Sequence, residues 1–365
     1  MNILYDHQAF TGMTYGGVTR YFYELMNAYS TRPGIDFELS LQFSNNEYLD
    51  KASFSQHHRY GFSQWRNVSR LASVVNRMYS SQRVRRGDFT VFHPTYFHNY
   101  FLENLGKKPL VVTFHDATSE RYGKQFPDVG EHLTAAKKIQ LARADRIIAV
   151  SEFSKQEILR FFPVDERKIE VIHLGTSFGQ RHAHVPTVPG THPYLLFVGK
   201  RGLYKNFDGF FRALRPLWQQ HPNLHLICAG GGAFTKEEKV QFRAAGVEQR
   251  IHHRTITDLS LYELYHHAEA FVFPSLNEGF GIPVLEAFGA GCPAVLSNHS
   301  SLPEVGGDAA LYFDPKEPDS ITTSLEKVLT DSTLRKQLRQ RGTERLANFS
   351  WQKTADKTQD LYRQL

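Results

Sequence analysis

The sequence has very little cysteine and no long hydrophobic run. Its 365 residues include only two cysteines, Cys228 and Cys292, and both stand in apolar surroundings. Two cysteines cannot form a disulfide framework, so we expect buried thiols in a reducing compartment. No stretch approaches the ~18 consecutive apolar residues that a membrane-spanning helix requires. The first residues, Met1–Asp6, lack the basic and apolar regions of a secretory signal, and we therefore expect a cytoplasmic protein.

Neither sign of charge dominates the sequence. Lysine and arginine together number 43 and aspartate and glutamate 37, which gives a net charge of +6. Hydrophobic residues make up 41% and charged residues 22%, so the disordered and low-complexity classes are excluded. The small positive excess suits an anionic partner without identifying it. No nucleic-acid recognition module is found, so we expect no nucleic-acid partner.

The length predicts two domains at ~150 residues per domain, and the first half alternates short apolar runs with helical periodicity. One helix face is indicated by the spacing of Val18, Tyr21, Phe22 and Leu25. Buried strands are expected at Ile3–Tyr5, Phe37–Phe43, Val91–His93, Leu110–Phe114, Ile147–Val150 and Ile169–Ile172. Strands and helices that alternate in this way predict a doubly wound parallel sheet.

The second half repeats this pattern. Strands are expected at Tyr194–Val198, Leu224–Ala229, Ala270–Pro274, Ala294–Ser297 and Ala310–Phe313. One or two helices are expected over Asp319–Asn348, and a last helix is expected to begin after an N-cap at Ser350. We therefore predict a first domain over residues 1–178, a linker over 179–193, a second domain over 194–349 and a C-terminal helix over 350–365.

Two glycines separate the first predicted strand from the first predicted helix. Gly16 and Gly17 let the backbone approach a ligand closely, and the amino end of the helix offers N–H groups and the positive end of its dipole. Both features suit a phosphate group. A Gly-Gly pair at this place is more often a simple tight turn, so the motif alone does not decide.

A basic segment follows the first predicted strand of the second half. In Val198–Asn206, Arg201 offers a planar guanidinium for phosphate oxygens and Lys205 a mobile point charge. Open parallel sheets bind ligands beyond the carboxyl ends of their strands, which is where these cations fall. The alternative is a solvated basic turn without a ligand.

Two glutamates bracket a glycine-rich turn that leads from a strand into a helix. Glu278 falls in the turn and Glu286 about one helical turn inside the helix, so both can face one ligand at different depths. Carboxylates there can accept hydrogen bonds from sugar hydroxyls, and the backbone N–H groups of Gly279–Gly281 can face an anion. In the alternative interpretation, one glutamate caps the helix and the other is exposed.

This segment resembles the E-x7-E signature of the retaining glycosyltransferases of family 4 (glycosyltransferase group 1), which have the GT-B fold. Further segments follow the order of that family: Gly16-Gly17, Phe114–Asp116, Ser151–Lys155, Arg201 with Lys205, and Ser301–Ala310. The resemblance covers nearly the whole chain. It implies two Rossmann-like α/β domains with doubly wound parallel sheets that face a cleft, and a C-terminal helix that crosses back to the first domain.

The resemblance also implies roles for the matched residues. The reaction centre, beside the transferred sugar, would contain His115 and Glu278. Within the donor site, Arg201 and Lys205 would hold the diphosphate and Glu286 the ribose. The complete set of implied donor-binding residues is Gly16, Gly17, Arg201, Lys205, Gly279, Phe280, Gly281, Leu285 and Glu286.

The implied reaction moves a hexose from a UDP- or GDP-sugar to a hydroxyl of a saccharide or lipid-linked saccharide, with retention, in surface polysaccharide biosynthesis. No Asp-x-Asp pair of the kind that holds a divalent ion occurs, so we expect no metal and no other cofactor. The alternative is a nucleotide-sugar epimerase of the same fold, which would consume the donor without an acceptor.

The region Asn45–Arg86, where the resemblance implies that the acceptor docks, matches nothing in the family, and the segment Arg66–Gly87 has a pattern of its own. It carries arginines without an acidic residue, and an apolar stripe at helical spacing is formed by Leu71, Val74, Val75 and Met78. Such a helix can lie on an anionic membrane at the inner face of the cell, as a peripheral contact. The alternative, which the pattern favours, is a domain helix whose apolar stripe packs on the sheet.

Overall fold

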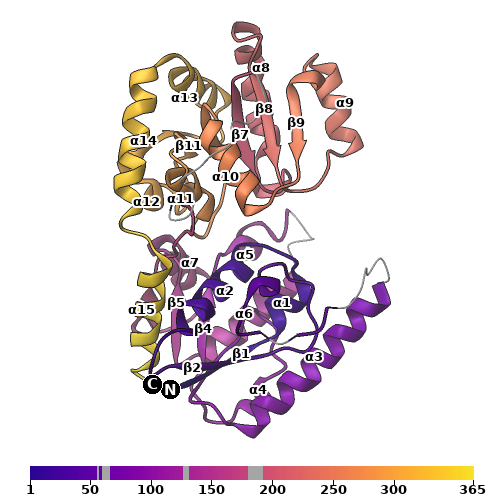
Figure 1. Cartoon of the computed structure of the whole chain (residues 1–365), viewed down its shortest axis with the longest axis vertical. Helices are drawn as coiled ribbons and strands as arrows, with labels where there is room; N and C mark the ends of the chain where they lie inside the picture. Colours follow the sequence, from indigo (N-terminus) through magenta and orange to yellow (C-terminus); the bar gives the residue numbers. More distant parts are fainter. Residues whose placement is uncertain (56, 60–65, 126–130, 180–191) are drawn as a thin grey trace. The chain divides into compact units, whose positions relative to one another are not determined.

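The computed structural model describes residues 1–55, 57–59, 66–125, 131–179 and 192–365, which form two compact α/β units (Figure 1). The first unit contains Met1–Leu174 and Trp351–Leu365, and the second contains Gly175–Ser350. The first unit thus ends at Leu174, a few residues before the predicted end of the first domain at residue 178. Most of the predicted linker, residues 180–191, lies outside the described residues.

The first unit is built on parallel strands. Two three-stranded ladders, in the orders β2-β1-β3 and β4-β5-β6, are joined by a parallel bridge between Phe92 and Leu110. The strands are β1 Asn2–Asp6, β2 Asp36–Ser40, β3 Val91–His93, β4 Val111–Phe114, β5 Arg146–Ala149 and β6 Ile169–Val171. The helices between them are α1 Gln8–Gly12, α2 Gly17–Tyr29, α3 Arg66–Arg86, α4 Leu102–Leu105, α5 Thr118–Tyr122, α6 Glu131–Arg143 and α7 Glu152–Phe161. Every strand predicted for this half is confirmed, with small differences at the ends.

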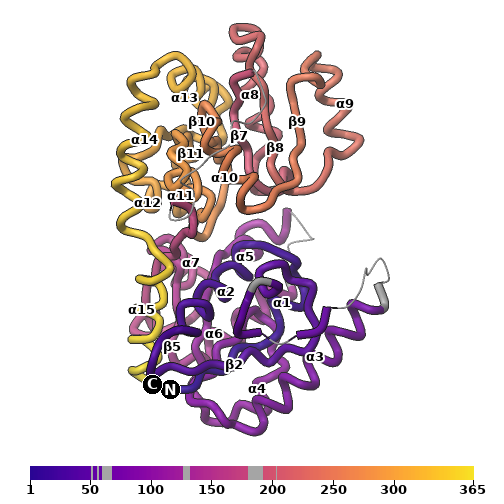
Figure 2. The backbone as a smooth tube through the Cα atoms, in the orientation of Figure 1, coloured from indigo at the N-terminus to yellow at the C-terminus, as the bar shows by residue number. Residues whose placement is uncertain are grey.

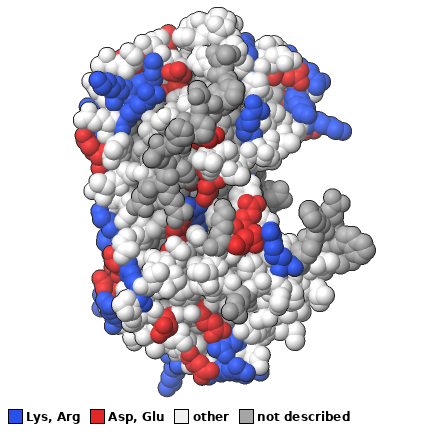
Figure 3. Space-filling model, viewed as in Figure 1, with Lys and Arg blue, Asp and Glu red and all other residues white. Residues whose placement is uncertain are grey.

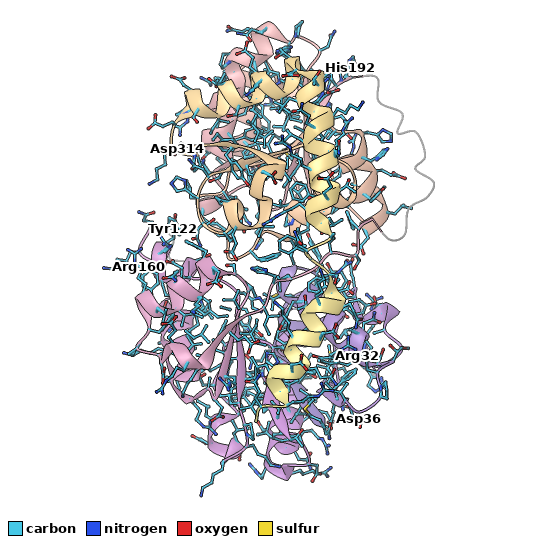
Figure 4. The ribbon with its side chains drawn as sticks, turned by 90° about the vertical axis from the view of Figure 1, so that its left-hand side faces the viewer. Arg32, Asp36, Tyr122, Arg160, His192 and Asp314 are labelled. Atoms are coloured by element: carbon cyan, nitrogen blue, oxygen red, sulfur yellow. The ribbon has the colours of Figure 1, made fainter. Side chains whose placement is uncertain are left out.

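The last helix, α15 (Trp351–Tyr362), belongs to the first unit and packs against α2 (Figure 2). Its Tyr362 hydroxyl lies 2.9 Å from the hydroxyl of Tyr5 on β1 and 2.5 Å from Nδ1 of His93 on β3. Arg32, which stands beside α15 in Figure 4, forms a 2.7 Å ion pair with Asp356. The predicted contact of the C-terminal helix with the first domain is confirmed.

The second unit contains one six-stranded parallel sheet in the order β12-β11-β10-β7-β8-β9. The strands are β7 Tyr194–Val198, β8 His225–Ala229, β9 Ile251–Arg254, β10 Ala270–Phe273, β11 Ala294–Ser297 and β12 Ala310–Phe313. The helices are α8 Phe207–Gln220, α9 Lys236–Ala244, α10 Asp258–His267, α11 Ile282–Gly289, α12 Leu302–Gly306, α13 Pro318–Thr330 and α14 Ser332–Leu346. All five predicted strands are confirmed, and β9 was missed.

The sheet of the second unit is buried on both faces at its centre. All residues of β7 and β10 are buried, with Leu195, Leu196 and Phe271 fully inaccessible. Helices on both sides of a parallel sheet explain why these strands are apolar along their whole length. The positions of the strand ends, and of the loops that leave them, are thereby fixed by the core.

Helix α3 is oriented against the expectation that its apolar stripe packs on the sheet. The face toward the unit buries two polar residues, Asn76 and Ser80, besides Ala72 and Val84. Asn76 accepts hydrogen bonds of 3.0 and 2.9 Å from the amides of Gln42 and Phe43. Ser80 lies 2.6 Å from Ser40 on β2. Buried polar groups with good partners anchor this helix. Of its apolar stripe, Leu71, Val74 and Met78 are exposed to solvent and Val75 is partly buried.

Candidate functional site

The candidate site of the second unit lies where the strand order reverses. β7 and β10 are hydrogen-bonded neighbours in the middle of the sheet, while β8 continues on one side and β11 on the other. Connections on the two sides therefore diverge, and open parallel sheets bind ligands at the carboxyl ends of strands placed in this way. Both predicted motifs of the second half, in residues 199–206 and 274–281, follow these strands directly.

The two loops are tied to each other by hydrogen bonds. The amide of Leu276 donates to the carbonyl of Tyr204 at 2.7 Å. Asn206 donates from Nδ2 to the carbonyls of Pro274 (3.2 Å) and Pro315 (2.7 Å). Its φ of 56° lies in the left-handed region that favours glycine or asparagine. Asparagine at this position therefore provides the backbone angle together with two bonds that glycine could not make.

Lys205 and Glu278, one from each loop, form an ion pair. Lys205 Nζ lies 2.6 Å from Glu278 Oε1, and the side chains are only 19% and 12% exposed. The ammonium also lies 5.3 Å from the centre of the Phe273 ring. Limited exposure strengthens the attraction between the two charges, so each holds the other at the strand ends.

The backbone of the Glu278 turn is held by two serines. Glu278 donates its amide to Ser300 Oγ at 3.0 Å, and Ser301 Oγ donates to the carbonyls of Glu278 and Phe280 at 3.0 and 2.9 Å. Gly281 has a φ of 103°, and a Cβ there would lie 2.9 Å from Leu302. Both conformation and space therefore require glycine before α11.

Glu286 lies on α11, within the second turn of the helix. The hydroxyl of Tyr265 donates to Glu286 Oε2 at 3.2 Å, and burial raises the pKa of that tyrosine far above its usual value. Phe280 and Leu285 are buried, so a donor could meet Phe280 only through its backbone. The structure brings Lys205, Glu278 and Glu286 to the carboxyl side of the same two strands.

Arg201 occupies a different environment from Lys205. Its guanidinium binds Glu238 at 2.7 Å, donates to the carbonyls of Gly232 and Ala233 at 2.9 Å each, and lies 4.8 Å from the centre of the Phe234 ring. The side chain is 4% exposed. Arg201 thus joins the loop after β7 to the loop after β8, and a direct contact with a ligand would require some of these bonds to be exchanged.

In the first unit, Gly16 and Gly17 form the amino end of α2 as expected. Gly16 is the N-cap with φ 151° and ψ 172°, a conformation almost restricted to glycine. A Cβ at Gly16 would meet nothing within 4 Å, so the backbone conformation and not packing demands glycine. The N–H groups of the first helical turn have no acceptor within the helix, which makes this end suitable for an anion.

His115 follows β4 directly and packs against α2. Its ring meets Tyr21 edge to face at a centroid distance of 5.4 Å. Burial lowers the pKa of His115 to about 4, although Asp116 acts in the opposite direction. Its Nε2 is buried without a hydrogen-bond partner among the described residues. At neutral pH the ring is uncharged, and it lies beside the helix that begins at Gly17.

Two family models match the chain, and together they span nearly all of it. Residues 15–178 match the model described as Glycosyltransferase Family 4, and residues 180–345 match the model described as Glycosyl transferases group 1. The chain belongs to glycosyltransferase family 4. The resemblance drawn from the sequence is confirmed, and the protein is a glycosyltransferase.

Individual glycosyltransferases are also similar to this chain in sequence. O-antigen chain mannosyltransferase B of Escherichia coli is 29% identical over 294 residues, which cover 76% of this chain and 75% of that protein. A glycogen synthase of Mycobacterium tuberculosis is 27% identical over 296 residues, covering 79% and 70%.

Two solved structures show the fold. Sucrose-phosphate synthase from Thermosynechococcus elongatus has a TM-score of 0.77 at 19% identity, over 100% of this chain and 98% of that one. Anabaena HepE, in complex with UDP and glucose, has a TM-score of 0.73 at 16% identity, over 100% and 99%. These likenesses confirm the GT-B fold.

Three residues that support the site of this family 4 enzyme were not recognised as such from the sequence. Glu238 binds Arg201 and also accepts from the amide of Thr235 at 2.7 Å, within a capping box. The pattern Thr-x-x-Glu before a helix signals that cap, but it does not reveal the arginine. Ser300 and Ser301 form hydrogen bonds with backbone atoms of the Glu278 turn, which is distant in the sequence. No local sequence pattern indicates such contacts.

The described residues contain no group of three or more His, Cys, Asp or Glu side chains that could hold a metal ion. None of the described helices is both long and apolar enough to cross a membrane. On the face shown in Figure 3, positive and negative side chains are interspersed over both units, so the small net charge does not gather into one basic field there.

Proposed function

We propose that this family 4 enzyme transfers a hexose from a UDP- or GDP-sugar to a hydroxyl of a saccharide or lipid-linked saccharide, with retention of the anomeric configuration. Assembly of a surface polysaccharide is the proposed setting. The proposal is supported by the similarity to an O-antigen chain mannosyltransferase and to HepE, which was solved with UDP and glucose. The observation that carries it is the Lys205–Glu278 pair at the point where the strand order reverses.

The two charged side chains of this pair can bind different parts of the donor. Lys205 would neutralise the diphosphate, while Glu278 would accept hydrogen bonds from hydroxyls of the sugar. Because the two heads already lie 2.6 Å apart, a donor that contacts both must place its sugar directly beside its phosphates. Glu286, on the adjoining helix, would bind the ribose, and the backbone of Gly279–Gly281 would face the phosphates.

Arg201 has a supporting role in this proposal. Its guanidinium is already satisfied by Glu238 and two carbonyls, so we assign it to positioning the loop that carries Lys205. Lys200, which follows Gly199 at the end of β7, is exposed and is a second candidate for a phosphate contact. Two lysines with different exposure would then share the neutralisation of the leaving group.

The first unit would contribute uncharged groups. The N–H groups at Gly16-Gly17 would bind a phosphate oxygen, and His115 would lie beside the sugar as a neutral ring. In the proposed step, the bond from the anomeric carbon to the diphosphate oxygen breaks, and the acceptor oxygen bonds to the same face of that carbon. The acceptor proton passes to the departing diphosphate oxygen, so no protein nucleophile is needed.

Transfer is proposed to be independent of a divalent metal, because fixed cations can stabilise the charge that develops on the diphosphate. The chelator EDTA should leave the rate unchanged. Loss of activity with EDTA and its recovery with Mg²⁺ would contradict this part of the proposal.

The proposal is tested by ligand-dependent stabilisation followed by product analysis. UDP, GDP and ADP are compared by thermal shift, because a ligand that binds only the folded state raises the melting temperature. The sugar nucleotides of the stabilising base are then incubated with and without saccharide acceptors, and the anomeric configuration of the product is read by NMR. An inverted product, or donor consumption that never depends on an acceptor, would overturn the proposal.

A further inference from the structure

The outward face of α3 is apolar along its centre. Leu71 is 65% exposed, Val74 42% and Met78 67%, and these residues follow one another at helical spacing on one side of the helix. In Figure 1, α3 lies at the margin of the first unit. Large apolar side chains that are exposed next to one another mark an interaction surface more often than single exposed ones do. We call this stripe, Leu71, Val74 and Met78, the outer stripe.

Arginines border the outer stripe. Arg70 and Arg77 are exposed along one side, and Arg85 and Arg86 are exposed at the carboxyl end of the helix. None of the ion pairs formed among the described residues involves these four side chains. The segment 66–86 contains no aspartate or glutamate, so its charge is not compensated within the helix. Arg83, in contrast, turns inward and binds Glu38 at 2.6 Å.

A cavity of about 580 Å³ opens beside the outer stripe. Arg77, Met78 and Arg85 line it from α3, and His98, Tyr100 and Glu103 are among the residues on its other side. Two arginines therefore meet an apolar side chain at the rim of a hollow that is large enough for a lipid headgroup. Glu103 from α4 is the one carboxylate among the residues that line this cavity.

We propose that the outer stripe and its bordering arginines bind the surface of an anionic lipid bilayer, with α3 lying parallel to the membrane. Leucine, valine and methionine would enter the region between headgroups and acyl chains, while the arginines contact lipid phosphates. A nucleic acid would use the arginines but would leave three large apolar side chains in water. The mixture of both classes on one helix face therefore favours lipid.

The polar anchoring of α3 supports this assignment. Asn76 and Ser80 fix the inner face by hydrogen bonds, so the helix need not rotate or refold to present the outer stripe. Binding would bring the first unit to a membrane that contains lipid-linked acceptors. That last link rests on the proposed function, whereas lipid binding itself does not.

The test is flotation of the full chain with vesicles of phosphatidylcholine alone or of phosphatidylcholine mixed with phosphatidylglycerol. We expect binding only to the mixed vesicles, and weaker binding as salt is raised. The pair Leu71→Ser and Met78→Ser, and separately the pair Arg70→Gln and Arg77→Gln, should each reduce the bound fraction about tenfold or more. The matched control, Val240→Ser with Leu259→Ser, removes two exposed apolar side chains from the second unit and should bind as the parent does.

The parent chain failing to float with anionic vesicles would overturn the proposal, as would binding that survives both double substitutions. A dimer of the parent chain that dissociates on Leu71→Ser and Met78→Ser would assign the outer stripe to a second copy instead. Nucleotide-induced thermal shifts are recorded for every variant. If the parent chain shows nucleotide-induced shifts but does not bind vesicles, only the membrane contact is contradicted. If it binds vesicles but shows no nucleotide-induced shift, the proposed donor is contradicted.

Discussion

The two units share a parallel-sheet architecture but differ in the predicted site residues that lie at their strand ends. In the second unit, charged side chains lie there in pairs, Lys205 with Glu278 and Arg201 with Glu238. In the first, the predicted residues are two glycines and His115, whose low pKa keeps the ring neutral at pH 7. The predicted site residues are thus paired charges in the second unit and uncharged groups in the first, although Asp116 beside His115 is a carboxylate whose pKa, against the opposing effect of burial, is lowered by Lys137 and by hydrogen bonds from Thr118.

This difference indicates how the work is divided. The negative charge of a diphosphate must be neutralised, and among the predicted site residues only those of the second unit have positively charged side chains. In the proposal, the first unit adds backbone N–H groups at Gly16-Gly17 for a phosphate oxygen and the neutral ring of His115 beside the sugar. We therefore expect removal of the positive charge of Lys205 to lower nucleotide affinity, whereas changes to groups that contact only the sugar should lower transfer.

The strongest challenge to this comparison is Lys205→Ala. It removes the charge assigned to the diphosphate and leaves Glu278 without its partner, so turnover should fall by about 100- to 1000-fold. Affinity for free UDP or GDP should fall with it, as measured by calorimetry. Lys239→Ala, an exposed lysine on α9 of the same unit, is the control. Unchanged nucleotide affinity in Lys205→Ala would remove this lysine from the phosphate site.

Glu278→Gln sharpens the comparison within the second unit. The side chain keeps its shape but loses the charge that strengthens hydrogen bonds to sugar hydroxyls, so turnover should fall by about 10- to 100-fold. Affinity for free nucleotide should change little, because the nucleotide carries no transferred sugar. Glu237→Gln, an exposed glutamate on α9, is the control. If nucleotide affinity and turnover fell equally, Glu278 would not be a sugar ligand.

The smallest effect concerns stability in the first unit. Burial lowers the pKa of His93 to about 3, well below the unfolded value near 6.5. As the pH falls below 6.5, the unfolded chain therefore binds a proton at His93, whereas the folded chain does not. Stability from this residue is complete above that pH and is lost on acidification, by roughly 2 kcal/mol between pH 7 and pH 5. Thermal melts at several pH values should show that the melting temperature of His93→Gln falls less on acidification than that of the parent. Equal slopes would contradict the lowered pKa of His93.

Most of the fold followed from the sequence because both sheets are covered on each face. Strands such as Tyr194–Val198 are continuously apolar and bounded by turn residues, so their existence and limits are visible locally. β9 was not predicted because only Ile251 is buried, while His252, His253 and Arg254 are polar. An edge strand needs one apolar face at most, and four residues give too short a pattern to detect.

The candidate site was predictable as a set of residues but not in its contacts. Glycines at positions 16 and 281 have positive φ angles, and such positions are marked by residue type alone. The partners of Arg201 lie in the loop after β8 and in α9, so its buried contacts could not be inferred from the basic segment. Helix α3 was misjudged for the opposite reason: Asn76 and Ser80 find buried partners that periodicity cannot reveal, and they outweigh the apolar stripe.

The return of α15 to the first unit affects how the molecule is made. Tyr5 and His93 emerge early from the ribosome, yet Tyr362, whose hydroxyl bonds to both, is translated only after the entire second unit. Until then the early strands lack a polar partner and their cover, which keeps the nascent first unit unfinished. Translation that stops within the second unit would leave neither half complete, and quality-control proteases could recognise such fragments by their exposed aromatic side chains.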